Sequence, residues 1–214
     1  MTAADPDTPI VLGNENGSIV VDSKLAEFWP FPYQYRYCIR CNAMSTATDF
    51  SSKVKANQGE TLQQLTEQYP FLPSLLDSAR SVNSYDSADY IHPIRFSAAV
   101  YFSDGHIAHS WFLKALEYGA SVDPVVQLIG QMKEYPTTRS SSCQPLVLAM
   151  LDQFDVCHAP FAAARTLLLE HGFGDLKVLH HDEDGQLAAS LVKDLFPVST
   201  AKIGSTFTHD DFRD

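Results

Sequence analysis

The fold is decided by the stretch Cys157-His158-Ala159-Pro160-Phe161-Ala162-Ala163-Ala164-Arg165. Pro160 is expected to open a helix there, because a proline at the first helical position lacks an N–H that would have no partner in any case. Leucines follow, and Gly172 is expected to end the helix. An upstream stretch has the same design: Asp123 caps a predicted helix that Pro124 opens and that runs to about residue 133.

The composition is that of a globular protein with one full core: 214 residues, 45% hydrophobic and 19% charged. The formal net charge is −11, and no run of Lys or Arg occurs, so a general nucleic-acid binder is excluded. No apolar stretch approaches the ~20 residues of a membrane span. The N-terminus lacks the basic and apolar regions of a signal peptide, so we expect a cytoplasmic or organelle-matrix protein. A presequence already removed from an organellar protein would leave the same sequence.

Three segments are predicted. Residues 1–58 form an N-terminal extension, residues 59–200 the main domain, and residues 201–214 a tail. The extension contains a hairpin within residues 1–23, built around Asn14-Glu15-Asn16-Gly17. It continues with an aromatic stretch over 28–37, which alternates as a strand from Tyr33 onward, and with a Ser/Thr/Ala-rich loop over 43–58.

The main domain reads as alternating strands and helices. A helical pattern over 59–81 is interrupted by Pro70 and Pro73. Strands are expected over 94–102, 106–112, 146–151 and 176–180, and helices over 123–133, 160–171 and 188–195. This order predicts an α/β fold of three layers, α-β-α, with a mixed sheet of about five strands and helices on both faces.

The four cysteines are expected to be reduced thiols. Cys38 and Cys41 have the spacing of a zinc half-site, but on a strand positions i and i+3 point to opposite faces. No second pair with this spacing exists to complete such a site.

Several local motifs, in this order, resemble the cytidine deaminase family over roughly residues 72–200. They are Ser97-Ala98-Ala99-Val100 of the opening strand, Asp104-Gly105 of its hairpin turn, Tyr118-Gly119 before the first metal helix, Pro160 with Arg165 in the frame Pro-Cys-x-x-Cys-Arg, and Asp182-Glu183-Asp184-Gly185 followed by Asp194-Leu195-Phe196-Pro197. The resemblance implies the family's fold and, commonly, a homo-oligomer.

The resemblance carries over no catalytic residue. The family's zinc is held by one His or Cys and two Cys, and a Glu moves protons. In this frame the first ligand position is Asp123 and the Glu position is Val125, while the two cysteine positions are Phe161 and Ala164. The ribose-binding Asn and Glu fall at Phe112 and Lys114. We therefore expect no zinc and no other cofactor.

An alternative metal site remains open at the same helix ends, formed by Asp123, Cys157 and His158. Cys157 and His158 are adjacent and should diverge at a strand end, so a helix cap and two buried polar residues are the favoured interpretation. The favoured function is a non-catalytic structural or binding subunit of a homo-oligomer or larger complex, without nucleic acid or membrane span. The alternatives are an active nucleoside deaminase with relocated zinc ligands and an unrelated α/β enzyme.

Overall fold

The computed structural model describes residues 9–13, 19–24, 43–116, 120–139 and 143–195. The chain divides into two compact units, residues 1–32 with 193–214 and residues 33–192. In the first unit β1 (Pro9–Gly13) pairs antiparallel with β2 (Ile19–Lys24), which confirms the predicted hairpin. The predicted aromatic strand, with Cys38 and Cys41, and the tail over 201–214 lie outside the described residues.

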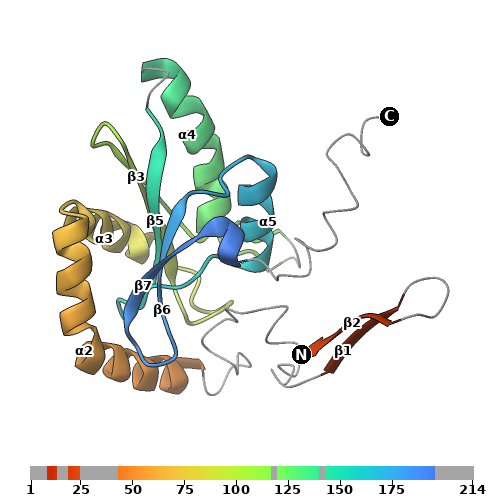
Figure 1. The fold of residues 1–214 in the computed structure, drawn as a ribbon. Coiled ribbons are helices and arrows are strands. Elements are labelled where there is room, and N and C mark those ends of the chain that lie inside the picture. Colours follow the sequence, from red (N-terminus) through yellow and green to blue (C-terminus); the bar gives the residue numbers. More distant parts are fainter. Residues whose placement is uncertain (1–8, 14–18, 25–42, 117–119, 140–142, 196–214) are drawn as a thin grey trace, which may run out of the picture. The chain divides into compact units, whose positions relative to one another are not determined.

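The second unit is built on a five-stranded mixed sheet (Figure 1). Its strands are β3 (Phe96–Phe102), β4 (Ile107–Trp111), β5 (Pro145–Asp152), β6 (Lys177–His181) and β7 (Leu187–Leu191). They lie in the order β4-β3-β5-β6-β7, with β5 and β6 parallel and the other neighbours antiparallel. The connection between the two parallel strands contains a helix, as such crossovers require.

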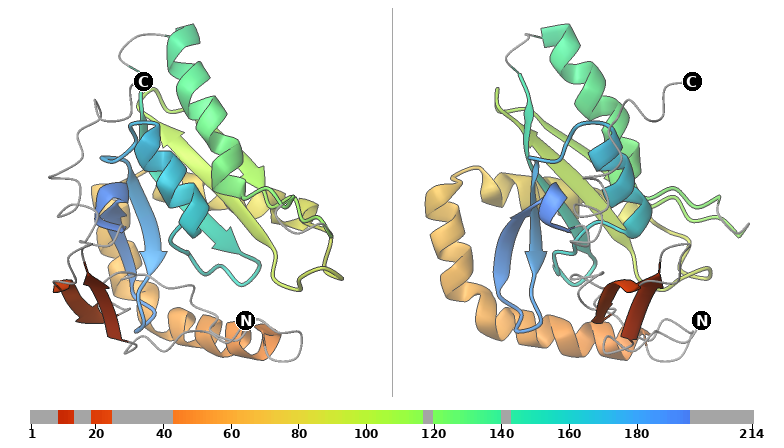
Figure 2. Two further views of the ribbon diagram at one scale, coloured as in Figure 1. Left: turned by 90° about the vertical axis from the view of Figure 1, so that its right-hand side faces the viewer. Right: turned by 45° about the vertical axis from the view of Figure 1, so that its right-hand side comes forward.

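Helices cover both faces of this sheet, as predicted (Figures 1 and 2). On one side lie α2 (Ala43–Gln68) and α3 (Leu72–Val82), the latter followed by a 3₁₀ turn, η1 (Asn83–Tyr85). On the other side α4 (Pro124–Arg139) contacts β3, β4 and α5 (Ala162–Glu170). The predicted helix at 123–133 therefore continues to Arg139, with Pro136 inside it. None of the described helices combines the length and apolar character needed to cross a membrane.

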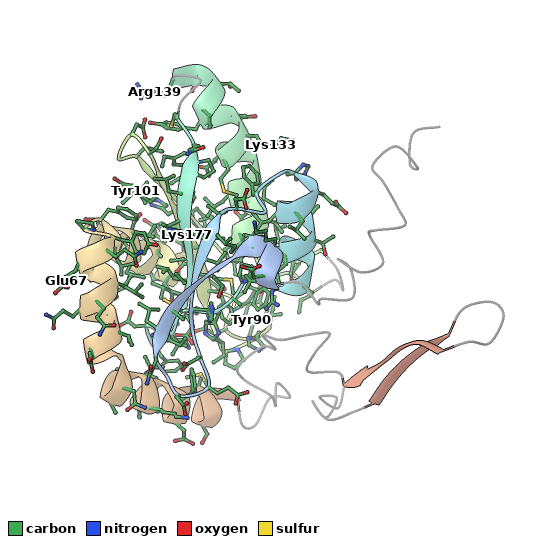
Figure 3. All side chains as sticks on the ribbon, in the orientation of Figure 1. Glu67, Tyr90, Tyr101, Lys133, Arg139 and Lys177 are labelled. Atoms are coloured by element: carbon green, nitrogen blue, oxygen red, sulfur yellow. The ribbon has the colours of Figure 1, made fainter. Side chains whose placement is uncertain are left out.

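The alternation of side chains along the strands divides the core into two halves. Ala99 of β3 packs with Leu72, Leu75 and Ala79 on the α3 face, together with Ala149 of its partner strand β5. Phe96 and Phe102 of β3 have the opposite parity, and Phe102 contacts Tyr135 of α4. Because successive strand side chains point to opposite faces, both halves are filled from the same strands (Figure 3).

The loop predicted over 43–58 is wrong, because these residues form the first part of α2, which crosses the expected boundary at residue 58 without a break. Ala47, Ser51 and Val54 recur at helical spacing and are buried. The Ser and Thr hydroxyls that suggest a loop instead bond within the helix: Thr48 Oγ1 donates to the Met44 carbonyl at 2.7 Å.

The helix α2 is fixed to the turn between β6 and β7. Lys53 Nζ donates to the Glu183 carbonyl, and Asn57 Nδ2 donates to the Asp184 carbonyl at 2.6 Å. Gly185 has a positive φ of 77°, and a Cβ atom placed on it would lie 3.0 Å from the Cα and N atoms of Val54. The glycine is therefore required both by its backbone conformation and by the close approach of α2.

The helix predicted over 188–195 is also wrong. Its first part is strand β7, in which Leu187 lies opposite His181, and only η2 (Val192–Leu195) is helical, as a 3₁₀ turn. Alanines favour a helix on propensity alone. The tight turn at Gly185 brings these residues alongside β6, whose outer edge offers backbone partners, and tertiary pairing overrides that local preference.

Candidate functional site

The start of α4 is capped by Asp123, as predicted. Its Oδ1 atom accepts hydrogen bonds from the N–H groups of Val125 at 2.6 Å and Val126 at 3.3 Å. Its Oδ2 atom is buried and has no hydrogen-bond partner among the described residues. Burial raises the pKa of Asp123 to about 6, against the opposing effect of the two amide hydrogen bonds. Val125, where the resemblance predicts the family's Glu, is completely buried.

The start of α5 differs from the prediction by two residues. The helix begins at Ala162, with Phe161 in the N-cap position and extended (φ −62°, ψ 162°), so Pro160 precedes the helix instead of opening it. The buried Pro160 has a different local role: its carbonyl accepts a hydrogen bond from Arg165 Nε at 2.6 Å. Burial lowers the pKa of Arg165 to about 10. The Phe161 side chain provides no cap for the helix N-terminus.

Phe161 belongs to what we call the aromatic cluster, which comprises Ala47, Phe50, Ile94, Phe96, Phe112, Phe154 and Phe161. The Phe161 ring meets Phe96 edge-on at 5.2 Å between ring centroids, and Phe112 at 6.1 Å. The α2 residues Ala47 and Phe50 add to the same cluster. One turn of α2 is tied to it by Ser51 Oγ, which donates to the Phe154 carbonyl at 3.1 Å.

Phe112 and Lys114, where the resemblance predicts ribose-binding residues, both make contacts within the protein. Phe112 is part of the aromatic cluster. Lys114 Nζ lies 2.9 Å from Asp86 Oδ1, with both side chains almost fully buried, and donates to the His92 carbonyl at 2.7 Å. Asp86 Oδ2 accepts the Phe96 N–H at 2.9 Å. Burial raises the pKa of Asp86, and the hydrogen bond from Lys114 opposes that rise.

Cys157 and His158 point to opposite sides of the sheet, as their adjacency predicts. Cys157 belongs to the core half beneath α3, and burial raises the pKa of its thiol far above the usual value. His158 lies on the other side against Phe96, with ring centroids 5.4 Å apart, and its Nε2 is 3.0 Å from Asp152 Oδ2. Across the described parts of the chain, no three His, Cys, Asp or Glu side chains are grouped so as to hold a metal ion.

Sequence reasoning missed the residues that hold this region together. Asp152 Oδ1 accepts N–H groups from Phe154 at 2.7 Å and Val156 at 3.1 Å, which shapes the turn before Cys157. His181 Nδ1 accepts the Cys157 N–H at 2.8 Å, and burial is the main cause that lowers the pKa of His181 to about 4. The Asp152 turn is local, and an Asp two residues before the N–H it accepts is a signal that the sequence offers. The His181 contact joins two different strand ends, for which the sequence carries no local pattern.

Comparison with solved structures identifies the class of fold. A mutant of the cytidine deaminase from Mycobacterium tuberculosis matches with a TM-score of 0.50 and 20% identity, over 66% of this chain and 98% of that chain. The cytidine deaminases from Mycobacterium leprae and Bacillus anthracis match with TM-scores of 0.48 and 0.46 and identities of 18% and 13%. They cover 59% and 63% of this chain and 97% and 93% of their own lengths.

The chain therefore has a cytidine-deaminase-like fold, with a mixed five-stranded sheet between helices. No protein-family model and no curated protein sequence matches it. At these identities the likeness defines the fold, and the chemistry has to be argued from the residues of this chain.

Proposed function

We propose that this chain is a non-catalytic protein of cytidine-deaminase-like fold that serves as a structural or binding subunit, within a homo-oligomer or a larger complex. The observation that carries the proposal is the aromatic cluster. It includes Phe161, where the resemblance places a cysteine ligand of zinc, and it is completed by Ala47 and Phe50 of α2. The first part of α2 thus shares one apolar core with the sheet of the second unit at this position.

The residue types at the family's positions support the same conclusion. Phe161 and Ala164 have no atoms that bind zinc, and Asp123 alone supplies one hard oxygen donor group. Without the metal, the pKa of a water molecule stays near 15.7 instead of about 7, a difference of roughly 12 kcal/mol. Val125 cannot transfer a proton in place of the family's Glu.

Two of the buried polar side chains nearby are paired within the chain. Lys114 pairs with Asp86, and His158 with Asp152, in buried surroundings. Taking either partner of such a pair away leaves a buried polar group or charge without compensation, at a cost of about 3–5 kcal/mol for an ion pair. These pairs therefore support a structural role for the four side chains, in which they bind each other instead of a substrate.

The exposed apolar residues after β4 support assembly. Leu113 and Leu116 are 45% and 81% exposed, and Val122, which pairs with Leu113 through two backbone hydrogen bonds, is 37% exposed. Large apolar side chains exposed together mark surfaces that association covers. Sedimentation velocity at micromolar concentration should show a species larger than the monomer, and a single monomer peak would contradict self-association.

The catalytic half of the proposal is tested by measuring zinc content and cytidine turnover on the full chain. We expect well under one equivalent of zinc, and no turnover of cytidine or deoxycytidine with zinc added. Val125→Glu restores one residue type and should still show no turnover, since the cysteine ligands remain absent. An active bacterial cytidine deaminase assayed in parallel controls for substrate and detection.

Chelator-sensitive turnover, or one equivalent of zinc, would overturn the proposal in favour of an active nucleoside deaminase with relocated ligands. Cys157→Ser and His158→Asn would then locate the metal, because both should lose zinc if Asp123, Cys157 and His158 form the site. Exposed His109→Asn is the matched control and should keep it.

A further inference from the structure

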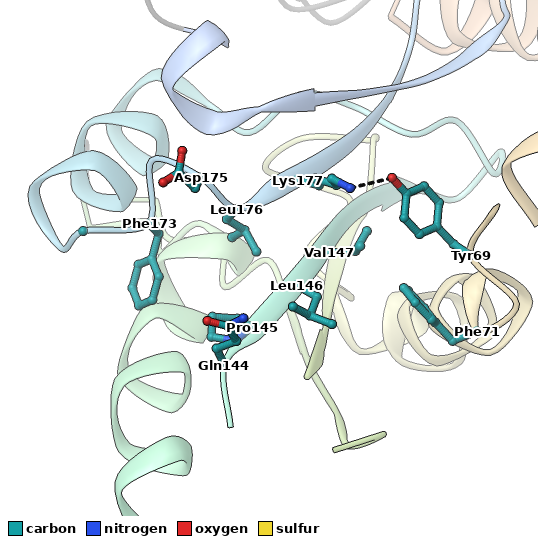
Figure 4. Close-up of a pocket in the computed structure, with 11 residues that line it drawn as sticks. Tyr69, Phe71, Gln144, Pro145, Leu146, Val147, Phe173, Asp175, Leu176 and Lys177 are labelled. Atoms are coloured by element: carbon teal, nitrogen blue, oxygen red, sulfur yellow. Dashed lines mark hydrogen bonds between the residues drawn. The ribbon is translucent and has the colours of Figure 1, made fainter. Parts of the chain in front are cut away.

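A groove lies at the beginning of β5 and β6 (Figure 4). The aromatic cluster lies at the other end of β5, where its member Phe96 is opposite Asp152. Its cavity measures about 490 Å³, within the range of small-molecule sites. The walls come from the α2–α3 link, the start of β5, and the link between α5 and β6. Since β5 spans eight residues, the groove and the Asp152 end of the strand are roughly 20 Å apart. The site is therefore separate from the one discussed above.

One end of the groove carries two polar groups side by side. Lys177 Nζ donates to the Tyr69 hydroxyl at 2.7 Å and lies 4.9 Å from the centroid of the Tyr69 ring (Figure 4). No carboxylate in the described part of the chain forms an ion pair with Lys177. An ammonium group has three donors, and a hydroxyl that accepts one hydrogen bond can still donate its own proton. Together they present one positive charge and two donor groups, with three donor hydrogens left, to the groove.

The apolar walls are held in place before any ligand arrives. Phe71 is stacked face to face on Tyr101, with ring centroids 3.6 Å apart and an angle of 2° between the planes. On the far side, Gly172 (φ 84°) ends α5, and Phe173 N–H donates to the Leu168 carbonyl at 2.8 Å. This C-capping arrangement fixes the chain that carries Phe173 along the groove. Leu146 of β5 lies between the two walls (Figure 4).

We propose that this groove binds a small aromatic monocarboxylate, with its carboxylate at Lys177 and Tyr69 and its ring against Phe71 and Leu146. One positive charge beside two donor groups matches the single charge of a carboxylate, whereas a phosphate dianion would keep one charge uncompensated. A preformed apolar slot with one polar anchor is the usual design of a small-molecule site.

The test uses 2-naphthoate as the probe, measured by calorimetry and by NMR shift mapping on the full chain. We expect saturable binding that perturbs the amides of Leu146 and Lys177. 2-Naphthylmethanol, which lacks the charge, should bind about tenfold more weakly, and 2-naphthyl phosphate should bind no better than the carboxylate. Absence of naphthoate binding at millimolar concentration would overturn the proposal. Tighter binding of the phosphate would overturn the assignment of a carboxylate.

Variants locate the probe. Lys177→Met keeps the apolar stem; it should weaken the binding of 2-naphthoate about tenfold and leave the binding of 2-naphthylmethanol unchanged. Tyr69→Phe should weaken the binding of 2-naphthoate several-fold. Lys55→Met, at an exposed position of α2, removes the same charge elsewhere and should leave binding unchanged. Equal losses in Lys55→Met and Lys177→Met would show non-specific attraction and overturn the proposal. If Lys177→Met fails to fold, NMR shift mapping with 2-naphthoate on the native chain tests the proposal instead. Perturbed amides away from the groove would then refute binding in the groove.

Discussion

Replacing Asp123 by asparagine is expected to stabilise the protein at pH 8 and to leave its stability nearly unchanged at pH 4. The side chain caps α4 through Oδ1, and an asparagine oxygen can accept the same two N–H hydrogen bonds. The substitution removes the negative charge from a buried carboxylate whose second oxygen has no partner in the described part of the chain. The effect should therefore appear only where the native carboxyl group is ionised.

The magnitude follows from the pKa of Asp123, which burial raises from 3.8 to about 6. At 1.36 kcal/mol per pKa unit, this difference corresponds to about 3 kcal/mol. A raised carboxyl pKa means that the folded state holds the proton more tightly. The stability it contributes is present below pH 3.8 and is lost as the pH rises through 6. The attraction between a carboxylate and a helix N-terminus, about 0.3–1 kcal/mol, is too small to reverse the sign.

Urea unfolding at several pH values tests this reasoning. Between pH 4 and pH 8 the midpoint of Asp123→Asn should rise relative to the native protein, by about 1–2 M for a slope of about 2 kcal/mol per M. Buried histidines such as His181, whose lowered pKa makes the fold less stable in acid, affect both proteins equally and cancel in the difference. Asp49→Asn, at an exposed position, should show no such pH-dependent difference. The reasoning is refuted if Asp123→Asn loses stability relative to the native protein as the pH rises.

Two further pairs of substitutions test how the structure is held together. Gly185→Ala should lower the free energy of unfolding by about 2–4 kcal/mol, because Gly185 has a positive φ and the new Cβ would meet backbone atoms of Val54. Gly59→Ala, in the open interior of α2, should raise the free energy of unfolding by about 0.5–1 kcal/mol. Equal effects of the two substitutions would contradict the close packing at Gly185. Lys114→Met should lower the free energy of unfolding by about 3–5 kcal/mol, because it leaves the buried Asp86 charge unpaired. Adding Asp86→Asn to this variant should recover part of the lost stability. A loss below about 1 kcal/mol in Lys114→Met alone would contradict a buried ion pair.

The sequence by itself determined four of the five strands of the sheet, β3 to β6, and the start of α4. The short run over residues 96–102 and the turn at Asp104-Gly105 are local signals, and together they predict the β3–β4 hairpin that the structure contains. The Asp123 cap could also be read directly, since a cap depends on residues within one turn of itself. The sequence also places apolar residues where the resemblance predicts the family's Glu and cysteines, and it predicts that Cys157 and its neighbour His158 diverge.

Only the tertiary structure decided what covers that region and what pairs within it. The Ser/Thr-rich residues 43–58 have weak local preferences, and they form a helix because Ala47, Phe50 and Val54 find a core to pack against. Residues 187–191 become a strand because the free edge of β6 needs backbone partners. The Lys114–Asp86 pair joins positions 28 residues apart, and the groove at Lys177 joins three separate segments. Such contacts depend on the path of the chain in space, which no local pattern of residues encodes.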